Sequence, residues 1–304
     1  MTRRSAALVS ATLLLLFARA PAHAASGSPS RFLRAEQPVS MAWTPDGTRL
    51  FFDEQATGDV RVATADGTVL PQPFAHLDVD ASSETGLLGV AVDPGSQQPW
   101  IYVYYSDPAL GLNRLVRFRA DGDVAAGPPQ VLLEGLGSQN RYHNGGALVF
   151  GSDGMLYVTV GESHEPSFAQ DRNSIGGKVL RLMPDGSVPP DNPIAGNPLF
   201  TLGHRNSFGI CVDPATGDLV GDRERTDERR RDQPAPSRAA TTAGPTSWAP
   251  ADPQGTIDPV VDHVQEIAPT GCAVWRGALY YGSYLDGAIR RLDLPPGTTL
   301  GRSR

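Results

Sequence analysis

Three glycine-containing phrases carry side chains that could move a proton and stabilise a negative charge. They read Glu84-Thr-Gly-Leu-Leu-Gly, His143-Asn-Gly-Gly-Ala and Gly203-His-Arg205-Asn206. An imidazole, whose ordinary pKa is about 6.5, can act as a general base near neutral pH. A fixed guanidinium can stabilise an oxygen on which negative charge develops. His143 and Arg205 together could therefore remove a proton from a bound hydroxyl group and stabilise the charge that forms nearby.

The other patterns in the chain do not form a recognisable catalytic or metal site. There is no zinc-ligand spacing, no Gly-x-Ser-x-Gly nucleophile phrase and no EF-hand loop. Lys178 follows two glycines, but the upstream glycine of a phosphate-binding loop is missing, so we predict an ordinary strand there. His164 lies in a polar loop and is predicted to face solvent. No chemistry is assigned to Glu162 or His204.

The elements that must position these residues are copies of one recurring phrase, in which alternating apolar residues flank a turn containing Pro, Asp or Gly. Copies begin at residues 41, 88, 146, 208 and 271, and each predicts a β-hairpin. A third β-rich run follows several copies, at residues 59–63, 114–118, 178–182 and 288–292. One hairpin cannot bury its apolar face alone, whereas hairpins that stack as blades around a channel can.

Repeats of this length, with several strands each, predict an all-β protein of the β-propeller class. Five copies are visible and the fifth ends near Leu294, so we predict that the propeller is incomplete and lacks its C-terminal blade. A β-sandwich with evenly spaced strands is the alternative, and the long period of the repeat argues against it.

The first 24 residues are typical of a secretory signal peptide. Arg3 and Arg4 precede an apolar run from Ala6 to Phe17, and Ala22-His-Ala24 resembles a cleavage site. We therefore predict a leader over residues 1–24, a propeller domain over residues 25–304, and a periplasmic or secreted protein. A membrane anchor is the alternative reading of the leader, and no later stretch is apolar enough to span a bilayer.

Charge and cysteine content narrow the possible partners and compartment. The formal net charge is −7, and loss of the three leader arginines would bring it to −10. Such an acidic chain argues against a nucleic-acid partner. Cys211 and Cys272 are the only cysteines. They could form a disulfide in an oxidising compartment, but two buried thiols are also compatible with the sequence.

Taken together, four phrases resemble the PQQ-dependent glucose and aldose dehydrogenases, also called the glucose/sorbosone dehydrogenase family. They are residues 84–91, 143–151, 180–193 and 203–209, which occur in family order with matching spacing. The resemblance covers about residues 30–220 and resumes from about 251 to 294. It implies a six-bladed propeller that holds pyrroloquinoline quinone (PQQ) at the channel mouth, with Ca2+ bridging PQQ to the protein.

The resemblance also implies a reaction, in which an aldose is oxidised at its anomeric carbon and a hydride passes to PQQ. His143 matches the general base, and Arg205 matches the cation beside the reduced quinone oxygen. Glu84, Arg205 and Asn206 match positions that contact the cofactor, and the pair Gly145-Gly146 would let the backbone approach a ligand closely. The implied partners are an aldose substrate and an external electron acceptor, while the residues that bind the metal stay unknown.

Residues 222–250 depart from the family pattern. This segment carries six arginines between Arg223 and Arg238 and lacks the phrases that supply oxygens near calcium in the family. With suitable codons, a one-base shift over residues 227–234 gives Thr-Ser-Asp-Asp-Glu-Ile-Asn, and a two-base shift over residues 239–245 gives Asn-Tyr-Gly-Trp-Pro. Both are family phrases. We therefore hypothesise that the segment is translated out of frame, which sequencing the gene would test.

Two further departures concern the cations that would hold PQQ. Leu285 and Asp286 stand where some family members carry Lys or Arg, and the last blade, which presents further arginines to the PQQ carboxylates, is predicted to lie beyond Arg304. Two other readings therefore stay open. One is a calcium-dependent propeller lactonase, and the other is a non-catalytic propeller whose cofactor site has decayed.

Overall fold

The computed structural model describes part of the chain. The described residues are 31–95, 99–137, 140–214, 216–217, 219–223, 239–242, 249–250, 261–263, 269–275, 277–283 and 288–293. The chain divides into two compact units, Met1–Phe32 and Leu33–Arg304, and every described strand belongs to the second. The predicted leader, Leu285, Asp286 and most of the aberrant segment 222–250 lie outside the described residues.

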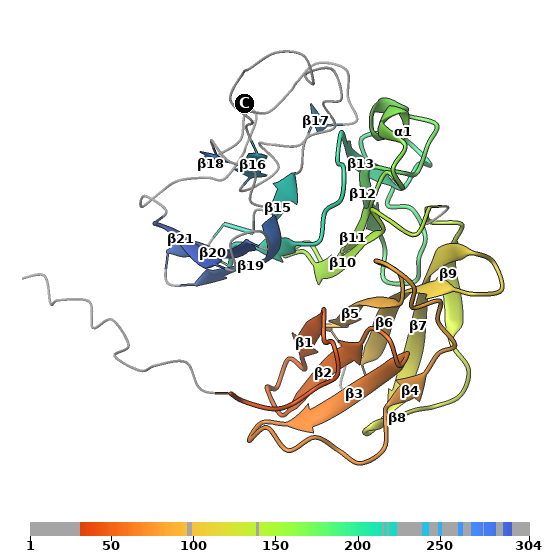
Figure 1. Cartoon of the computed structure of the whole chain (residues 1–304), viewed down its shortest axis with the longest axis vertical. Helices are drawn as coiled ribbons and strands as arrows, with labels where there is room; N and C mark the ends of the chain where they lie inside the picture. The colour runs from red at the N-terminus through yellow and green to blue at the C-terminus, as the bar shows by residue number, and fades with distance from the viewer. Residues whose placement is uncertain are drawn as a thin grey trace, which may run out of the picture. The chain divides into compact units, whose positions relative to one another are not determined.

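The described strands form five antiparallel sheets that follow one another along the chain, as Figure 1 shows by colour and label. The first two sheets contain β1 (Met41–Trp43), β2 (Arg49–Glu54), β3 (Asp59–Thr64) and β4 (Ala75–His76), then β5 (Leu87–Val92), β6 (Trp100–Asp107), β7 (Leu112–Asp121), β8 (Val124–Ala125) and β9 (Gln130–Glu134). The third contains β10 (Gly145–Phe150), β11 (Leu156–Val160), β12 (Lys178–Leu182), β13 (Leu199–Leu202) and β17 (Ala249–Pro250). The last two contain β14 (Ile210–Val212), β15 (Leu219–Arg223), β16 (Ala239–Thr242) and β18 (Val261–His263), then β19 (Pro269–Trp275), β20 (Ala278–Ser283) and β21 (Ala288–Asp293).

Each predicted copy of the repeat opens one sheet, so the five predicted hairpins are confirmed. In each sheet the first two strands pair as the hairpin and the predicted β-rich run supplies the third strand of four sheets, with β12 beginning and ending at the predicted residues. The first strands of consecutive sheets also contact one another, from β1 to β5, β10, β14 and β19 in turn. This succession of sheets that meet through their first strands is the arrangement of a β-propeller.

The apolar residues of one strand serve two interfaces because successive side chains point to opposite faces. On β6, Ile101 and Val103 pack with residues of the first sheet, while Tyr102 and Tyr104 pack with residues of the third. This explains why β5 and β6 are buried almost throughout rather than on alternate residues.

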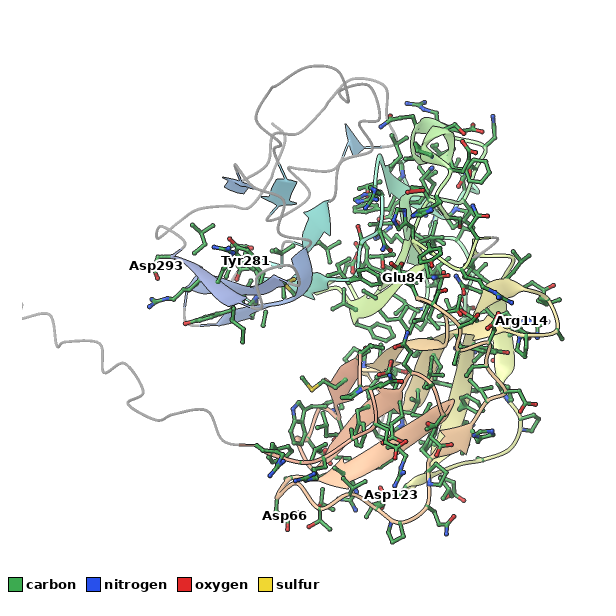
Figure 2. The ribbon with its side chains drawn as sticks, viewed as in Figure 1. Asp66, Glu84, Arg114, Asp123, Tyr281 and Asp293 are labelled. Atoms are coloured by element: carbon green, nitrogen blue, oxygen red, sulfur yellow. A yellow bond between two sulfur atoms is a disulfide. The ribbon has the colours of Figure 1, made fainter. Side chains whose placement is uncertain are left out.

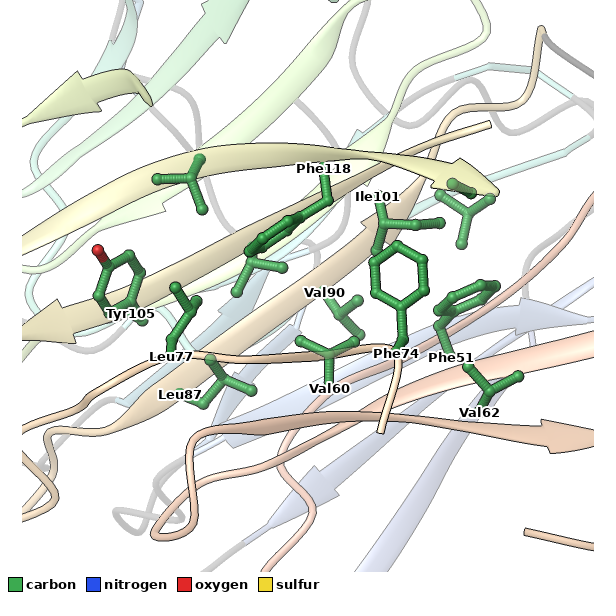
Figure 3. Close-up of a cluster of buried hydrophobic side chains, with 14 residues drawn as sticks. Phe51, Val60, Val62, Phe74, Leu77, Leu87, Val90, Ile101, Tyr105 and Phe118 are labelled. Atoms are coloured by element: carbon green, nitrogen blue, oxygen red, sulfur yellow. The ribbon is translucent and has the colours of Figure 1, made fainter. Parts of the chain in front are cut away.

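One apolar cluster lies between each pair of consecutive sheets. Between the first and second sheets, the ring of Phe74 meets those of Phe51 and Phe118 edge to face, with centroids 5.2 and 6.1 Å apart. Figure 3 shows the three side chains in this cluster. Further clusters join the second sheet to the third, the third to the fourth and the fourth to the fifth. The core is therefore a series of layers between sheets, which confirms the propeller and rules out a single sandwich interior. Six blades stay a prediction.

Two short pieces of the aberrant segment are strands. Residues 239–242 form β16, which pairs with β15 and β18 in the fourth sheet, and residues 249–250 form β17 at the edge of the third sheet. No alternation of apolar residues predicts these strands, because strand pairing uses backbone groups, which residues such as Ala239 and Thr242 provide as well as larger apolar residues do.

A disulfide joins the fourth and fifth sheets. Cys211 on β14 bonds to Cys272 on β19, with 5.7 Å between their Cα atoms. The sulfurs lie in the apolar cluster between these sheets, beside Val220, Leu279 and Tyr281. Of the two alternatives left open by the sequence, the structure therefore shows the paired one.

The short helix α1 (Pro166–Gln170) is anchored by a buried lysine. Lys178 lies in a strand as predicted, but its ammonium donates to the carbonyl oxygens of Phe168 at 2.5 Å, Ala169 at 3.3 Å and Gly176 at 2.5 Å. The lysine thus caps α1 and fixes the connection between β11 and β12. Within the described residues, no helix has the length and hydropathy needed to cross a bilayer.

Candidate functional site

Three of the predicted site residues occupy corresponding positions in the repeat. Glu84, His143 and Asn206 each lie in the connection that leads into the first strand of a sheet, namely β5, β10 and β14. Because these first strands contact one another in order, the connections that precede them meet. The fold thus brings together residues that are up to 122 positions apart in the sequence.

The Glu84 carboxylate links the other two residues. Its Oε2 accepts from the backbone N–H of His143 at 2.8 Å and from Asn206 Nδ2 at 3.2 Å. Figure 2 labels Glu84 among the side chains of this region. Its Oε1 has no hydrogen-bond partner within the described part of the chain. Glu84 therefore holds the site together with one oxygen and leaves the other available.

Asn206 is buried and braces the loop that carries His143. Its Oδ1 accepts from the backbone N–H of Gly145 at 3.2 Å, while its Nδ2 donates to Glu84. Both ends of the amide are therefore engaged in holding the connections in place. The structure shows this bracing role for Asn206 directly, and contact with a cofactor stays a prediction.

His143 presents one open nitrogen. The residue is 5% exposed, and Nδ1 bonds to Oε1 of the buried Glu162. A carboxylate can only accept, so Nδ1 carries the proton and Nε2 is the basic nitrogen. Nε2 has no hydrogen-bond partner among the described residues. The geometry therefore suits a general base, because the bond from Nδ1 to Glu162 orients the ring while Nε2 stays available.

Glu162 is the functional residue that the sequence did not single out. It follows β11, and its backbone N–H donates to the carbonyl of Arg205 at 2.8 Å. Its Oε2 is buried and lacks a partner in the described part of the chain. Glu162 therefore connects the His143 ring to the backbone of Arg205.

Arg205 is half-buried beside this pair. The structure places its backbone against Glu162 and, through the next residue Asn206, against the loop of His143. Arg205 and His143 thus lie in connections that contact each other through the backbone. The role of the guanidinium stays a prediction.

The second sheet supports the site through a buried polar network. Asn113, with no exposed surface, donates to Asn144 Oδ1 and to the carbonyl of Leu136, both at 3.0 Å. Tyr104 places its hydroxyl 3.0 Å from the Leu136 carbonyl and 3.1 Å from that of Asn144. Burial raises the pKa of Tyr104, so this hydroxyl stays a donor. These contacts fix both ends of the loop that carries His143.

The prediction that Gly145-Gly146 admits a ligand is not supported by the contacts of these residues. A Cβ on Gly145 would lie 2.8 Å from the backbone of Gly161, and one on Gly146 would lie 2.8 Å from Leu88 Cβ. Both glycines also have positive φ. They are therefore required by the close approach of neighbouring strands, which leaves no room for a side chain.

Strained backbone is concentrated at this site. Among the described residues, five of the six non-glycine residues with positive φ lie in the connections around His143, with φ between 54° and 63°. Such conformations cost about 1 kcal/mol or more each and tend to occur where function requires them. The five are Ser83, Arg141, His143, Ser163 and His164.

His164 is exposed, as predicted, but its ring also contacts the ring of His143. Its ring lies edge to face with that of His143, with centroids 4.0 Å apart and an interplanar angle of 79°. Tyr142 stacks on His164 at 5.1 Å and 13°. An aromatic pair therefore lies directly beside the candidate base.

The described residues fit the reactive part of a quinone site better than they fit a metal site. A buried imidazole with an open Nε2, and a carboxylate oxygen of Glu84 without a partner, could face a polar ligand. Among the described residues, no group of three or more His, Cys, Asp or Glu side chains could hold a metal ion. The calcium prediction is therefore not supported by the described side chains.

Comparisons with known proteins agree on one family. The sequence model described as Glucose / Sorbosone dehydrogenase matches residues 35–228. The chain is 30% identical over 213 residues to quinoprotein glucose dehydrogenase B of Acinetobacter calcoaceticus, covering 59% of this chain and 44% of that protein. It is 29% identical over 196 residues to an aldose sugar dehydrogenase of Escherichia coli K12, covering 60% and 52%. The matches thus span about half the length of these two relatives.

A solved structure extends the likeness to the fold. The PQQ-bound aldose sugar dehydrogenase of Streptomyces coelicolor matches with a TM-score of 0.73 at 28% identity, covering 89% of this chain and 80% of that one. The likeness therefore extends well beyond the residues that the family model matches.

Proposed function

Because the chain belongs to the Glucose / Sorbosone dehydrogenase family, we propose that it oxidises an aldose at the anomeric carbon with PQQ as the hydride acceptor. The observation that carries this proposal is the buried His143, whose Nδ1 is bound by Glu162 while Nε2 is open. An imidazole held in this way can accept a proton from a hydroxyl group at one defined atom.

The residues of the chain would divide the work in a simple way. His143 would take the proton of the anomeric hydroxyl on Nε2, and the Glu162 carboxylate would stabilise the imidazolium that results. PQQ, when bound, supplies the electron sink that no side chain provides. Arg205 would stabilise negative charge on the quinone oxygen, and Oε1 of Glu84 could accept a hydrogen bond from a hydroxyl of the sugar.

The remaining parts of the proposal rest on the sequence alone. Glu84, Arg205 and Asn206 would contact PQQ, and Ca2+ would bridge PQQ to the protein. An external electron acceptor follows from the same family resemblance, whereas export to the periplasm or beyond rests on the signal-peptide pattern of residues 1–24.

The test is an assay of the purified full chain with PQQ and CaCl2, in which reduction of an electron-accepting dye is measured for a panel of aldoses. We expect His143→Gln to lower kcat/KM by at least about 100-fold, because it removes the base. The control is His76→Gln, since His76 is an exposed histidine paired with Asp59 at 2.7 Å in the first sheet. It should retain wild-type activity.

Other outcomes would contradict the proposal. Equal dye reduction in His143→Gln would show that His143 is not the base. Calcium-dependent lactone cleavage without PQQ would instead support the lactonase reading. A folded protein that neither binds PQQ nor reduces dye would support the non-catalytic reading.

A further inference from the structure

We propose that His164 is a positioning residue, whose ring fixes the direction of Nε2 on His143. This inference rests on the proposed function only in taking His143 as the base. The ring centroids of the two histidines lie 4.0 Å apart, which is van der Waals contact, at an interplanar angle of 79°. His164 is therefore a direct neighbour of the base, although it is exposed and offers no hydrogen bond to it.

A second contact is needed because the hydrogen bond to Glu162 does not fix the imidazole completely. That bond anchors Nδ1 but leaves the ring free to rock about the line that joins Nδ1 to the carboxylate oxygen. Rocking would swing Nε2, which lies on the far side of the ring. A wall against the ring removes this freedom. Proton transfer requires alignment to a fraction of an ångström, so such a wall affects the rate.

His164 can serve as a wall because it is itself held from two sides. Tyr142 stacks on it at 5.1 Å with nearly parallel rings. The preceding residue is anchored as well, since Ser163 donates its N–H to the carbonyl of His143 at 3.2 Å and accepts from Asn140 Nδ2 at 2.7 Å. Anchored residues and a stacked ring give the loop little room to shift.

The backbone conformation of this loop also indicates that the imidazole of His164 has a specific role. Ser163 and His164 have φ values of 56° and 58°, in the left-handed region where glycine or asparagine would fit at lower cost. Neither ring nitrogen of His164 has a hydrogen-bond partner among the described residues. The contacts that the side chain makes are therefore ring contacts, and one of them is with the base.

Two substitutions separate the ring from the rest of the side chain. His164→Asn keeps a polar residue that tolerates the left-handed backbone but removes the ring, and we expect kcat to fall about tenfold with little change in KM or thermal stability. His164→Phe keeps a ring without ionisable nitrogens. It should retain kcat within about threefold and leave the pH profile unchanged, whatever the strained backbone does to its stability. His76→Asn, at the exposed histidine of the first sheet, is the control.

A readout that does not need the reaction comes from the base itself. The orientation of the His143 ring, taken from crystal structures or from NMR of the labelled imidazole, should be single in the wild type and in His164→Phe but multiple in His164→Asn. A single orientation and wild-type kcat in His164→Asn would overturn the inference, as would equal losses of kcat in both variants. If the wild type oxidises no sugar, the proposed function fails, while ring orientation still decides this inference.

Discussion

The chemistry of single residues at this site begins with the proton on Nδ1 of His143. The Glu162 carboxylate can only accept from that nitrogen, so it selects the tautomer that leaves Nε2 basic. The same carboxylate would offset the positive charge that the ring gains when it takes up a proton. The two residues are therefore expected to behave as one unit.

Removing the charge of Glu162 tests this unit. In Glu162→Gln the amide oxygen can still accept from Nδ1, but the negative charge is lost and the amide N–H2 can favour the other tautomer. We expect kcat/KM to fall ten- to a hundredfold, with an unchanged melting temperature within a few degrees. Steady-state dye reduction measures the first and calorimetry the second. Glu165→Gln, at an exposed carboxylate of the same loop, is the control. Wild-type activity in Glu162→Gln would contradict the pairing.

Prediction of the site from the sequence depended on phrases rather than on contacts. Glu84, His143 and Asn206 stand out because glycines mark their phrases, and the structure brings them together. Gly161 also precedes Glu162, but what makes Glu162 and His164 matter is a contact with a ring 19 or 21 residues away in the sequence. Local patterns cannot show such a contact. The glycines of the His143 phrase predict a close approach of the backbone to a ligand, whereas in the structure their closest contacts are with neighbouring strands and leave no room for a Cβ.

At the scale of elements, the hydrogen bonds of Lys178 hold α1 in place. Burial lowers the pKa of Lys178 to about 8, so at pH 7 the ammonium is still mostly charged and can donate to all three carbonyls. Lys178→Met would leave the Gly176 carbonyl without a donor among the described residues, whereas the backbone N–H groups of Asp171 and Gly203 would still donate to Phe168 and Ala169. We expect a loss of about 2 kcal/mol in the free energy of unfolding. Arg172→Met, at an exposed position in the same connection, should change stability by less than about 0.5 kcal/mol. Urea unfolding of both variants provides the comparison.

Asp53 on β2 makes stability depend on pH. Its Oδ1 accepts from the backbone N–H groups of Val39 and Ser40, but its Oδ2 is buried without a partner in the described part of the chain. Burial raises the pKa of Asp53 from 3.8 to about 7. The folded state therefore holds this proton more tightly, and its stabilising contribution is lost as the pH rises from about 4 to 7, at up to about 1.4 kcal/mol per pH unit.

The matched variant for this prediction is Asp53→Asn, which cannot ionise. Urea unfolding between pH 5 and pH 7 should show the wild type losing stability relative to the variant as the pH rises. Parallel curves for the two proteins would mean that Asp53 does not change its protonation over this range.

The hairpins could be predicted from the sequence because each combines period-2 apolar runs with a marked turn. The short strands could not. Strands of two or three residues, such as β4, β8 and β18, contain too few residues to show a period. Their position is set by the backbone groups that the neighbouring strand offers, so pairing rather than composition determines them.

For the whole molecule, the disulfide between Cys211 and Cys272 is the covalent cross-link between sheets. It closes a loop with a sequence separation of 61 residues, which limits the unfolded chain and is worth about 4 kcal/mol by loop entropy. The double variant Cys211→Ala/Cys272→Ala should lose stability of that order in urea unfolding. Reductant should destabilise the wild type similarly but leave the variant unchanged. Insensitivity of the wild type to complete reduction, verified by thiol titration, would contradict this.

For the whole molecule, the sequence predicts the repeated hairpins and the stacking of their sheets. Five hairpins at a long period predict stacked sheets, because an isolated hairpin leaves its apolar face open, and the clusters between sheets confirm this. The repeat pattern does not determine the number of blades in the propeller. That number depends on how the sheets turn about an axis, which is a property of packing angles that no residue pattern records.

Glu84, His143 and Asn206 belong to the connections between the first and second, second and third, and third and fourth sheets. No single sheet, and no pair, contains the site. On the ribosome, a nascent chain would have to release more than 206 residues and bring together the first strands of the second, third and fourth sheets before these side chains could meet. A small molecule that binds all three side chains would therefore bind only the folded protein. By mass action, it would shift the folding equilibrium away from partly folded forms in which the connection before β14 has not docked.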